Sequence, residues 1–142
     1  MDAIEISRTG LDVEWQRLQV IAQNLANINT TRTAAGGPYR PLRLVSGPHS
    51  GFARLAGVLP AGYKPEGVAV LGIEPIAGGV RRVHEPENPD ADAQGYVNYP
   101  DIDHASEMTL LIKTSRAYEA NLTAMSIAQQ MYSRAAELGR GA

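Results

Sequence analysis

An aspartate-rich string has the side chains of a cation-binding loop. From position 90 to position 101 the sequence reads DADAQGYVNYPD, with oxygen-bearing side chains at string positions 1, 3, 5, 9 and 12 and glycine at position 6. Carboxylate and amide oxygens at these positions, around a turn glycine, are typical of a calcium loop. The residues that would supply them are Asp90, Asp92, Gln94, Asn98 and Asp101. A calcium-binding regulatory module is therefore one functional hypothesis.

The surroundings of this string argue against calcium. Pro89 precedes the string and Pro100 interrupts it, so the helices that flank a helix-loop-helix cation site are not expected. The twelfth position holds Asp101, which is one methylene shorter than the glutamate usual there. The alternative interpretation is a connector whose aspartates accept hydrogen bonds from their own backbone.

The histidines give little indication of catalysis. His84, Asp90, Asp92, Asp103 and His104 contain the groups of a metal or acid–base cluster, but no two histidines are four residues apart. No glycine-rich phosphate loop and no cysteine is present in the sequence. We therefore expect a protein that is not an enzyme and binds no cofactor.

Length and charge narrow the class of protein. A chain of 142 residues has the size of a single domain. A formal net charge of −2 gives no basic surface for nucleic acid or anionic membrane. No apolar run is long enough to span a bilayer, so direct membrane insertion is not expected. The first residues lack a basic and then an apolar region, so we also expect no cleavable secretory signal.

The stretch from Asp103 to Leu138 predicts one long helix. It contains no proline and no glycine, and Gly139 follows it as the expected stop. Asp103 or Ser106 is expected to cap its start. A heptad row and a second row three residues behind it are typical of a seam between helices. The first row is Leu111, Tyr118, Met125 and Tyr132, and the second is Met108, Ser115, Leu122, Gln129 and Ala136.

Residues 2 to about 29 predict the partner helix. Asp2 and Glu5 have the spacing of a capping box. Gly10 is unfavourable inside a helix and marks either a kink or a later start. The apolar heptad positions are Ile4, Leu11, Leu18 and Leu25, with Trp15 and Ala22 beside them.

The middle of the chain predicts a small β-rich insert. All nine prolines and most of the 14 glycines lie there, which excludes long helices. Residues 39–45 are expected to be an edge strand, and residues 68–73 are the strongest strand candidate. A turn at residues 78–79 predicts a hairpin of this strand with residues 80–84. Residues 84–100 are expected to form an extended connector.

The predicted fold is therefore α+β. Long N- and C-terminal helices pack as an antiparallel coiled-coil pair, with the Pro/Gly-rich insert between them. The predicted segments are residues 1–30 for the first helix, 31–100 for the insert and connector, and 101–142 for the second helix.

Several polar residues lie on or beside the apolar stripes. The amides of Asn24, Asn27, Asn121 and Gln129 are either exposed at the stripe edge or form hydrogen bonds that set the register of the packed helices. Arg17 is expected on a solvated face.

Four stretches resemble the flagellar axial proteins, the rod and hook group. Residues 24–31, NLANINTT, resemble the N-terminal signature of the family, and residues 115–121, SRAYEAN, resemble its C-terminal signature. Residues 31–40 and 84–100 narrow the resemblance to one member of the rod group. The similarity runs from about residue 6 to residue 139.

The resemblance implies a structural subunit of the bacterial basal-body rod. Axial proteins pack their terminal helices as an inner layer, assemble helically, transmit torque and form the wall of the export channel. The implied partners are other rod proteins, copies of the chain, and the membrane-embedded ring and export-gate base. The implied location is the periplasmic rod, reached by type III export.

We expect the two helices to be poorly ordered until they assemble. The expected seam residues are Leu11, Trp15, Leu18, Leu25, Leu111, Tyr118, Leu122 and Met125. The expected contacts between subunits are Asn24, Asn27, Arg116 and Glu119.

Overall fold

A computed structural model describes residues 2–49 and 66–140 of the chain. Residues 1, 50–65 and 141–142, which belong to the three predicted segments, lie outside this description. In chain order the elements are α1 (Ala3–Ala26), β1 (Leu42–Pro48), β2 (Val68–Pro75), β3 (Val80–His84), β4 (Tyr96–Pro100) and α2 (His104–Arg140). The predicted α+β class is confirmed.

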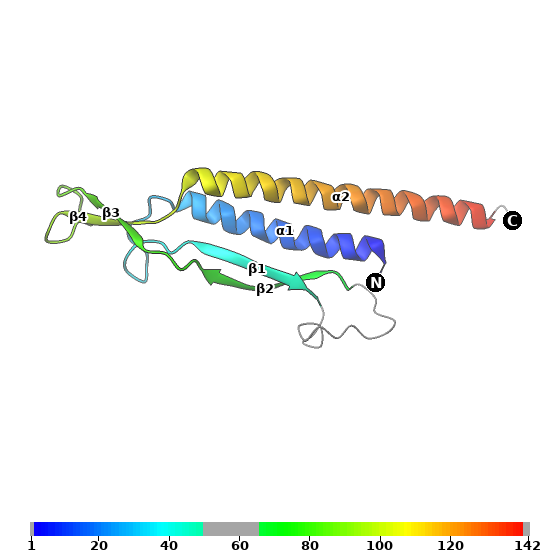
Figure 1. The fold of residues 1–142 in the computed structure, drawn as a ribbon, viewed down its shortest axis with the longest axis horizontal. Helices are drawn as coiled ribbons and strands as arrows, with labels where there is room; N and C mark the ends of the chain where they lie inside the picture. The colour runs from blue at the N-terminus through cyan, green and yellow to red at the C-terminus, as the bar shows by residue number, and fades with distance from the viewer. Residues whose placement is uncertain (1, 50–65, 141–142) are drawn as a thin grey trace.

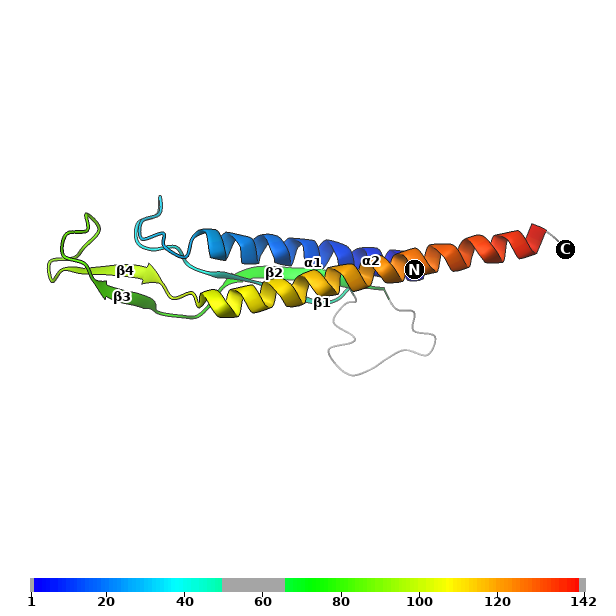
Figure 2. The ribbon, with the colours of Figure 1, turned by 90° about the horizontal axis from the view of Figure 1, so that it is seen from above.

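Helix α1 forms the middle layer of an elongated molecule (Figure 1). The β1–β2 hairpin covers one side of α1 and helix α2 covers the other, and α2 packs on no strand of the described chain. The two helices run in opposite directions, as predicted for the antiparallel pair. Figure 2 shows the C-terminal part of α2 continuing past the N-terminus of α1.

The predicted capping of both helices is confirmed. The Asp2 carboxylate accepts a hydrogen bond from the Glu5 amide at 2.9 Å, and Glu5 accepts from the Asp2 amide at 3.2 Å. This capping box satisfies amides that have no partner inside the helix. Asp103 likewise accepts from the Ala105 amide at 3.3 Å and from the Ser106 hydroxyl at 2.6 Å.

The helix ends differ slightly from the prediction. Helix α1 ends at Ala26 with Asn27 as its cap, rather than near residue 29. The predicted stop at Gly139 is wrong, because α2 continues to Arg140. Gly139 does not adopt the positive φ of a left-handed stop and stays within the helix. The 37 residues of α2 span about 55 Å.

The pairing of the strands differs from the prediction. The expected hairpin of residues 68–73 with residues 80–84 is wrong, because β2 pairs antiparallel with β1, with a bulge between Val45 and Ser46. Strand β3 pairs antiparallel with β4, so the predicted extended connector closes into a second hairpin. Strands β1 and β2 pair and together cover α1. This shared packing is not visible from how close the strands are in the sequence.

The core lies between α1 and the β1–β2 hairpin. Val13 and Val20 of α1 pack with Leu44 of β1, and all three are nearly inaccessible to solvent. Val68 and Val70 of β2 complete this cluster. In the part of the chain described, neither helix has both the length and the apolar character needed to cross a bilayer.

Replacing Leu44 should show how strongly this core holds α1 to the hairpin. Leu44→Ala is expected to lower the free energy of unfolding by about 2–4 kcal/mol, because it removes buried methyl groups and leaves a cavity. Denaturation by urea, followed by circular dichroism, measures this. Leu71→Ala is the matched control, because Leu71 is 66% exposed on the neighbouring strand. Equal losses in the two variants would contradict the assignment of the core.

Candidate functional site

The amide of Asn24 joins α1 to the first hairpin. Asn24 is only 1% exposed. Its Oδ1 accepts from the Leu42 backbone amide at 2.9 Å, and its Nδ2 donates to the Leu42 carbonyl at 2.9 Å. The Tyr39 hydroxyl donates to the same Oδ1 at 3.0 Å. Because it binds both backbone polar groups of one strand residue, the Asn24 side chain pairs with β1 as a neighbouring strand would.

The same amide reaches the second helix. Asn24 Nδ2 also lies 3.4 Å from Glu107 Oε2, and Glu107 is only 7% exposed. Burial raises the pKa of the Tyr39 hydroxyl, and the negative charge of Glu107 raises it further. Solvent exposure, one of the two interpretations of Asn24, is therefore wrong, and its amide bonds to the facing helix.

Two more polar side chains attach α1 to the hairpin. Arg17 was expected on a solvated face, and this expectation is wrong. Its Nη1 donates to the Leu44 carbonyl at 3.3 Å, its Nη2 donates to Ser46 Oγ at 2.8 Å, and its Nε pairs with Glu14 at 3.1 Å. Nearly two turns from the start of α1, the Thr9 hydroxyl accepts a hydrogen bond from the Val68 backbone amide, at the beginning of β2, at 3.1 Å.

On α2, the positions buried against α1 lie one residue before part of the predicted seam. The first predicted row is half-buried at Leu111, Tyr118 and Met125. In the second row, Met108 and Leu122 are exposed, at 37% and 46%. The buried positions on α2 are Glu107 and Thr114, each one residue before a position of that row. The heptad pattern did not predict Glu107 and Thr114 because it is based on apolar residues.

On α1, the predicted seam residues Leu11, Leu18 and Leu25 are half-buried. Trp15 is 54% exposed, and its ring centroid lies 6.3 Å from that of Tyr118 on α2. A groove of about 420 Å³ opens beside this aromatic pair. Its lining residues are Arg8, Leu11, Asp12, Trp15, Tyr118 and Met125.

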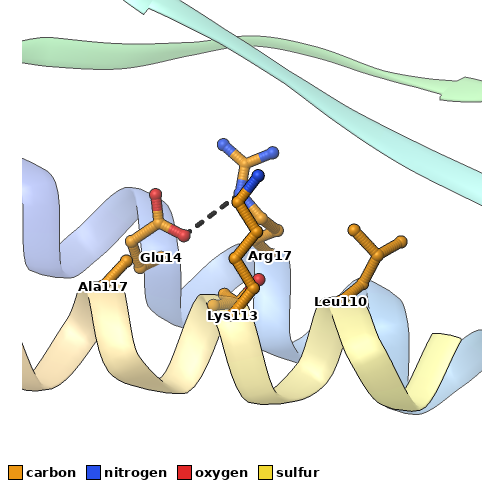
Figure 3. Close-up of a pocket in the computed structure, with 6 residues that line it drawn as sticks. Glu14, Arg17, Leu110, Lys113 and Ala117 are labelled. Carbon is orange, nitrogen blue, oxygen red and sulfur yellow. Dashed lines mark hydrogen bonds and ion pairs between the residues drawn. The ribbon is translucent and has the colours of Figure 1, made fainter. Parts of the chain in front are cut away.

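The opposite flank of the helix pair carries a charged groove of about 320 Å³ (Figure 3). Its lining residues are Glu14, Arg17, Leu110, Lys113, Thr114 and Ala117. Figure 3 shows Lys113 of α2 extending toward Glu14 and Arg17 of α1. The helix pair therefore presents an aromatic flank and a charged flank.

The remaining predicted contact residues lie elsewhere. Asn27 caps the end of its own helix, because its Nδ2 donates to the Gln23 carbonyl at 2.8 Å and its Oδ1 accepts from Thr30 at 3.1 Å. Arg116 and Glu119 are exposed on α2. Within the described ranges, neither has an ion pair or a side-chain hydrogen bond to another side chain.

The first half of the aspartate-rich string, residues 90–95, lies in the turn between β3 and β4, and its second half contains β4. Asp92 Oδ1 accepts from the backbone amides of Gln94 at 3.0 Å and Tyr96 at 2.9 Å, and Asp92 Oδ2 pairs with Arg82 at 2.5 Å. These bonds, led by the one from Tyr96, hold the pKa of the Asp92 carboxyl below its ordinary value. The interpretation of a connector that bonds its own backbone is confirmed at Asp92.

Asp90 of the same string attaches the second hairpin to the segment after α1. Its carboxylate pairs with Arg32 at 2.5 Å and accepts from the Thr31 hydroxyl at 2.7 Å. Asn98 and Asp101 are exposed. Across residues 2–49 and 66–140, no three candidate metal-binding side chains come together. Two of the three carboxylates that the calcium hypothesis requires, those of Asp90 and Asp92, are thus bonded to arginines instead.

Comparison with known proteins agrees with this architecture. Residues 93–138 match the family model of the flagellar basal body rod FlgEFG protein C-terminal region. The flagellar basal-body rod protein FlgC of Borreliella burgdorferi is 33% identical over 147 aligned residues, covering 98% of this chain and 97% of the relative. That of Bacillus subtilis is 34% identical, with 97% of each covered, and that of Salmonella typhimurium is 30% identical, with 99% and 98% covered.

The paired terminal helices and the matched C-terminal region define a flagellar axial protein of the rod group. Full-length similarity at this level narrows the assignment further. The chain belongs to the FlgC family of flagellar basal-body rod proteins, which are structural and not enzymatic.

Removing the Asn24 side chain should test its central position. Asn24→Ala is expected to lower the free energy of unfolding by about 2–4 kcal/mol, because it leaves buried backbone groups of Leu42 and the Glu107 carboxylate without a partner. Thermal unfolding followed by circular dichroism measures this. Asn27→Ala removes the same atoms from a half-buried cap and should cost about 1 kcal/mol or less. A smaller loss at Asn24 than at Asn27 would contradict the assignment.

The β3–β4 turn should respond to acid through Asp92. Because the folded-state pKa of Asp92 is depressed, its charge stabilises the turn above the ordinary aspartate pKa of about 4. That contribution is lost as the pH falls through the folded-state value. The amide shifts of Gln94 and Tyr96, followed by NMR, should titrate with Asp92. Asp92→Asn should abolish this titration, whereas Asp101→Asn should preserve it. Persistence in Asp92→Asn would exclude Asp92 as its source.

Proposed function

We propose that this chain is a rod subunit that assembles helically through α1 and α2. Its helix pair would form part of the inner layer of the rod, with residues 31–100 on the outside. In this position the subunit transmits torque and contributes to the wall of the export channel. The proposal rests on the family membership and on the surfaces that the two helices leave uncovered.

The observation that carries the proposal is the free end of α2. Residues 129–140 are exposed throughout and extend roughly 18 Å. Met131, Tyr132 and Leu138 on this segment are 66%, 71% and 78% exposed. A helix end with large exposed apolar side chains gains stability when another helix covers it. We name residues 129–140 the overhang.

Exposed apolar side chains along the paired part of α2 support contacts with more than one neighbour. Leu110, Ile112, Leu122 and Ile127 are between 44% and 53% exposed. Arg116 and Glu119 lie exposed on the same helix. Contacts that join different surfaces of successive subunits are heterologous, and such contacts propagate into helical assemblies. We assign Leu122, Arg116 and Glu119 to these contacts.

Membership in the rod family supports a proposal for the partners and the location. We propose that the neighbours are copies of this chain, other rod proteins, and the membrane-embedded ring with its export gate. We propose that its location is the periplasmic rod of the flagellar basal body, reached through the type III export apparatus. From the sequence we expected both helices to become ordered on assembly. We now propose this ordering only for the overhang, because α1 already packs against the β1–β2 hairpin and against α2 within the chain.

A charge placed on the overhang should prevent assembly without unfolding the chain. Tyr132→Asp is expected to abolish motility in cells that lack their own copy of the gene, while the unfolding midpoint of the purified chain stays unchanged. Gln130→Asp adds the same charge about 160° around the helix and should preserve motility. Hydrogen exchange should show rapid exchange of residues 129–140 in the free chain and protection in purified rods. Full motility of Tyr132→Asp, or equal exchange in both states, would contradict the proposal.

A further inference from the structure

The apolar stripes of the two helices do not define a unique alignment. Leu111, Tyr118 and Met125 repeat every seventh residue, as do Leu11, Leu18 and Leu25. If α2 slides by seven residues, one apolar row still faces the other. Any unique register must therefore come from residues that break this repeat.

Two cross-helix contacts break the repeat and agree on one register. Asn24 meets Glu107 at one end of the pair, and Gly10 meets Asn121 near the other end. Asn24 and Gly10 are two heptads apart on α1, and Glu107 and Asn121 are two heptads apart on α2. Both contacts therefore fit the same antiparallel alignment.

The position midway between these contacts is also polar. Arg17 lies one heptad from both Asn24 and Gly10, and the corresponding residue of α2 is Thr114. The two residues line the same groove, and Thr114 is only 4% exposed. Once per heptad, therefore, two facing positions of the seam are polar or hold glycine instead of apolar side chains.

The contact of Gly10 with Asn121 depends on shape. A Cβ atom at Gly10 would lie 2.6 Å from Asn121 Oδ1 and 2.9 Å from its Cγ. The Asn121 side chain therefore fills the space that any other residue at position 10 would need. Its Nδ2 donates to the Ala117 carbonyl at 3.0 Å, which holds the side chain in this orientation. We name this contact the Gly10–Asn121 notch.

We infer that the Gly10–Asn121 notch and the Asn24–Glu107 hydrogen bond together lock the register of α2 on α1. A slip of one heptad in one direction would take Asn121 away from Gly10 and place it against the Arg17 side chain. A slip in the other direction would place Glu107 against Arg17 and Asn121 beyond the notch. In both cases the buried Glu107 carboxylate loses the amide of Asn24. The polar layers therefore select one alignment that the apolar stripes alone leave open.

The register determines how far the overhang extends past α1. A slip of one heptad would lengthen or shorten the overhang by about 10 Å. If the overhang contacts neighbouring subunits, as the proposed function requires, the lock sets the position of that contact. The lock itself is a property of the isolated chain and is tested without the rod.

A distance between spin labels on the two helices reports the register directly. The chain has no cysteine, so cysteines placed at the exposed positions Gln19 and Ser126 can each carry a label. The otherwise unchanged chain should give a single distance. A chain with Asn24→Leu, Glu107→Leu and Asn121→Leu should add a second distance shifted by about 10 Å. One unchanged distance in that variant, or no defined distance in the unchanged chain, would overturn the inference.

The notch is tested by the sign of a single substitution. Helix propensity alone predicts that Gly10→Ala raises the unfolding midpoint. The notch predicts a lower midpoint, because alanine displaces Asn121 and breaks its bond to Ala117. Gly139→Ala is the matched control, since no side chain of the described residues beyond its chain neighbours lies within 4 Å of the added Cβ, and it should not lower the midpoint.

The double variant Gly10→Ala/Asn121→Ala should recover the midpoint of Asn121→Ala alone. A higher midpoint in Gly10→Ala, or effects of the two substitutions that simply add, would overturn the notch. That result would leave the proposed rod function standing, because it concerns only packing within the chain. Loss of motility in Tyr132→Asp is a separate measurement, which tests the proposed rod function and not the notch.

Discussion

The arrangement of the molecule depends on one buried amide. Asn24 bonds to both backbone groups of Leu42, to the Tyr39 hydroxyl and to Glu107. A buried amide without partners is costly, so this set of bonds permits only one relative placement of the elements it joins. Helix α1, the start of β1 and the first turn of α2 meet at this point. In the sequence, both hairpins lie between α1 and α2. The long, thin shape follows, because the helices extend together from this end (Figure 1).

The two helices have unequal positions in the chain. Helix α1 is covered by the hairpin on one side and by α2 on the other, so its apolar residues divide between two partners. Helix α2 has one partner and is longer than that partner, so much of its apolar surface stays exposed. Stability within the chain therefore centres on α1, whereas surface for association centres on α2. A closed globule of this length would not leave that surface free.

The sequence predicted the parts of the structure that depend on local spacing. Both helices, their N-terminal caps and one row of the seam follow from periodicity and capping residues. The second row was misplaced because Glu107 and Thr114 are buried polar residues, which an apolar pattern does not contain. The strand pairing was missed because β1 and β2 meet through their shared contact with α1. Arg17 was placed on the surface because its acceptors, Leu44 and Ser46, belong to a strand distant in sequence.

The two signature stretches can now be given physical content. Asn24 begins the first, NLANINTT, and Asn121 ends the second, SRAYEAN. The two amides lie toward opposite ends of the paired region. Asn24 is bonded to Glu107, and Asn121 fills the notch at Gly10. Alignment errors in a helix pair are multiples of a heptad, so two specific contacts far apart along the seam reject them more strongly than one. Since the overhang begins where the pair ends, these amides act on its position without touching it.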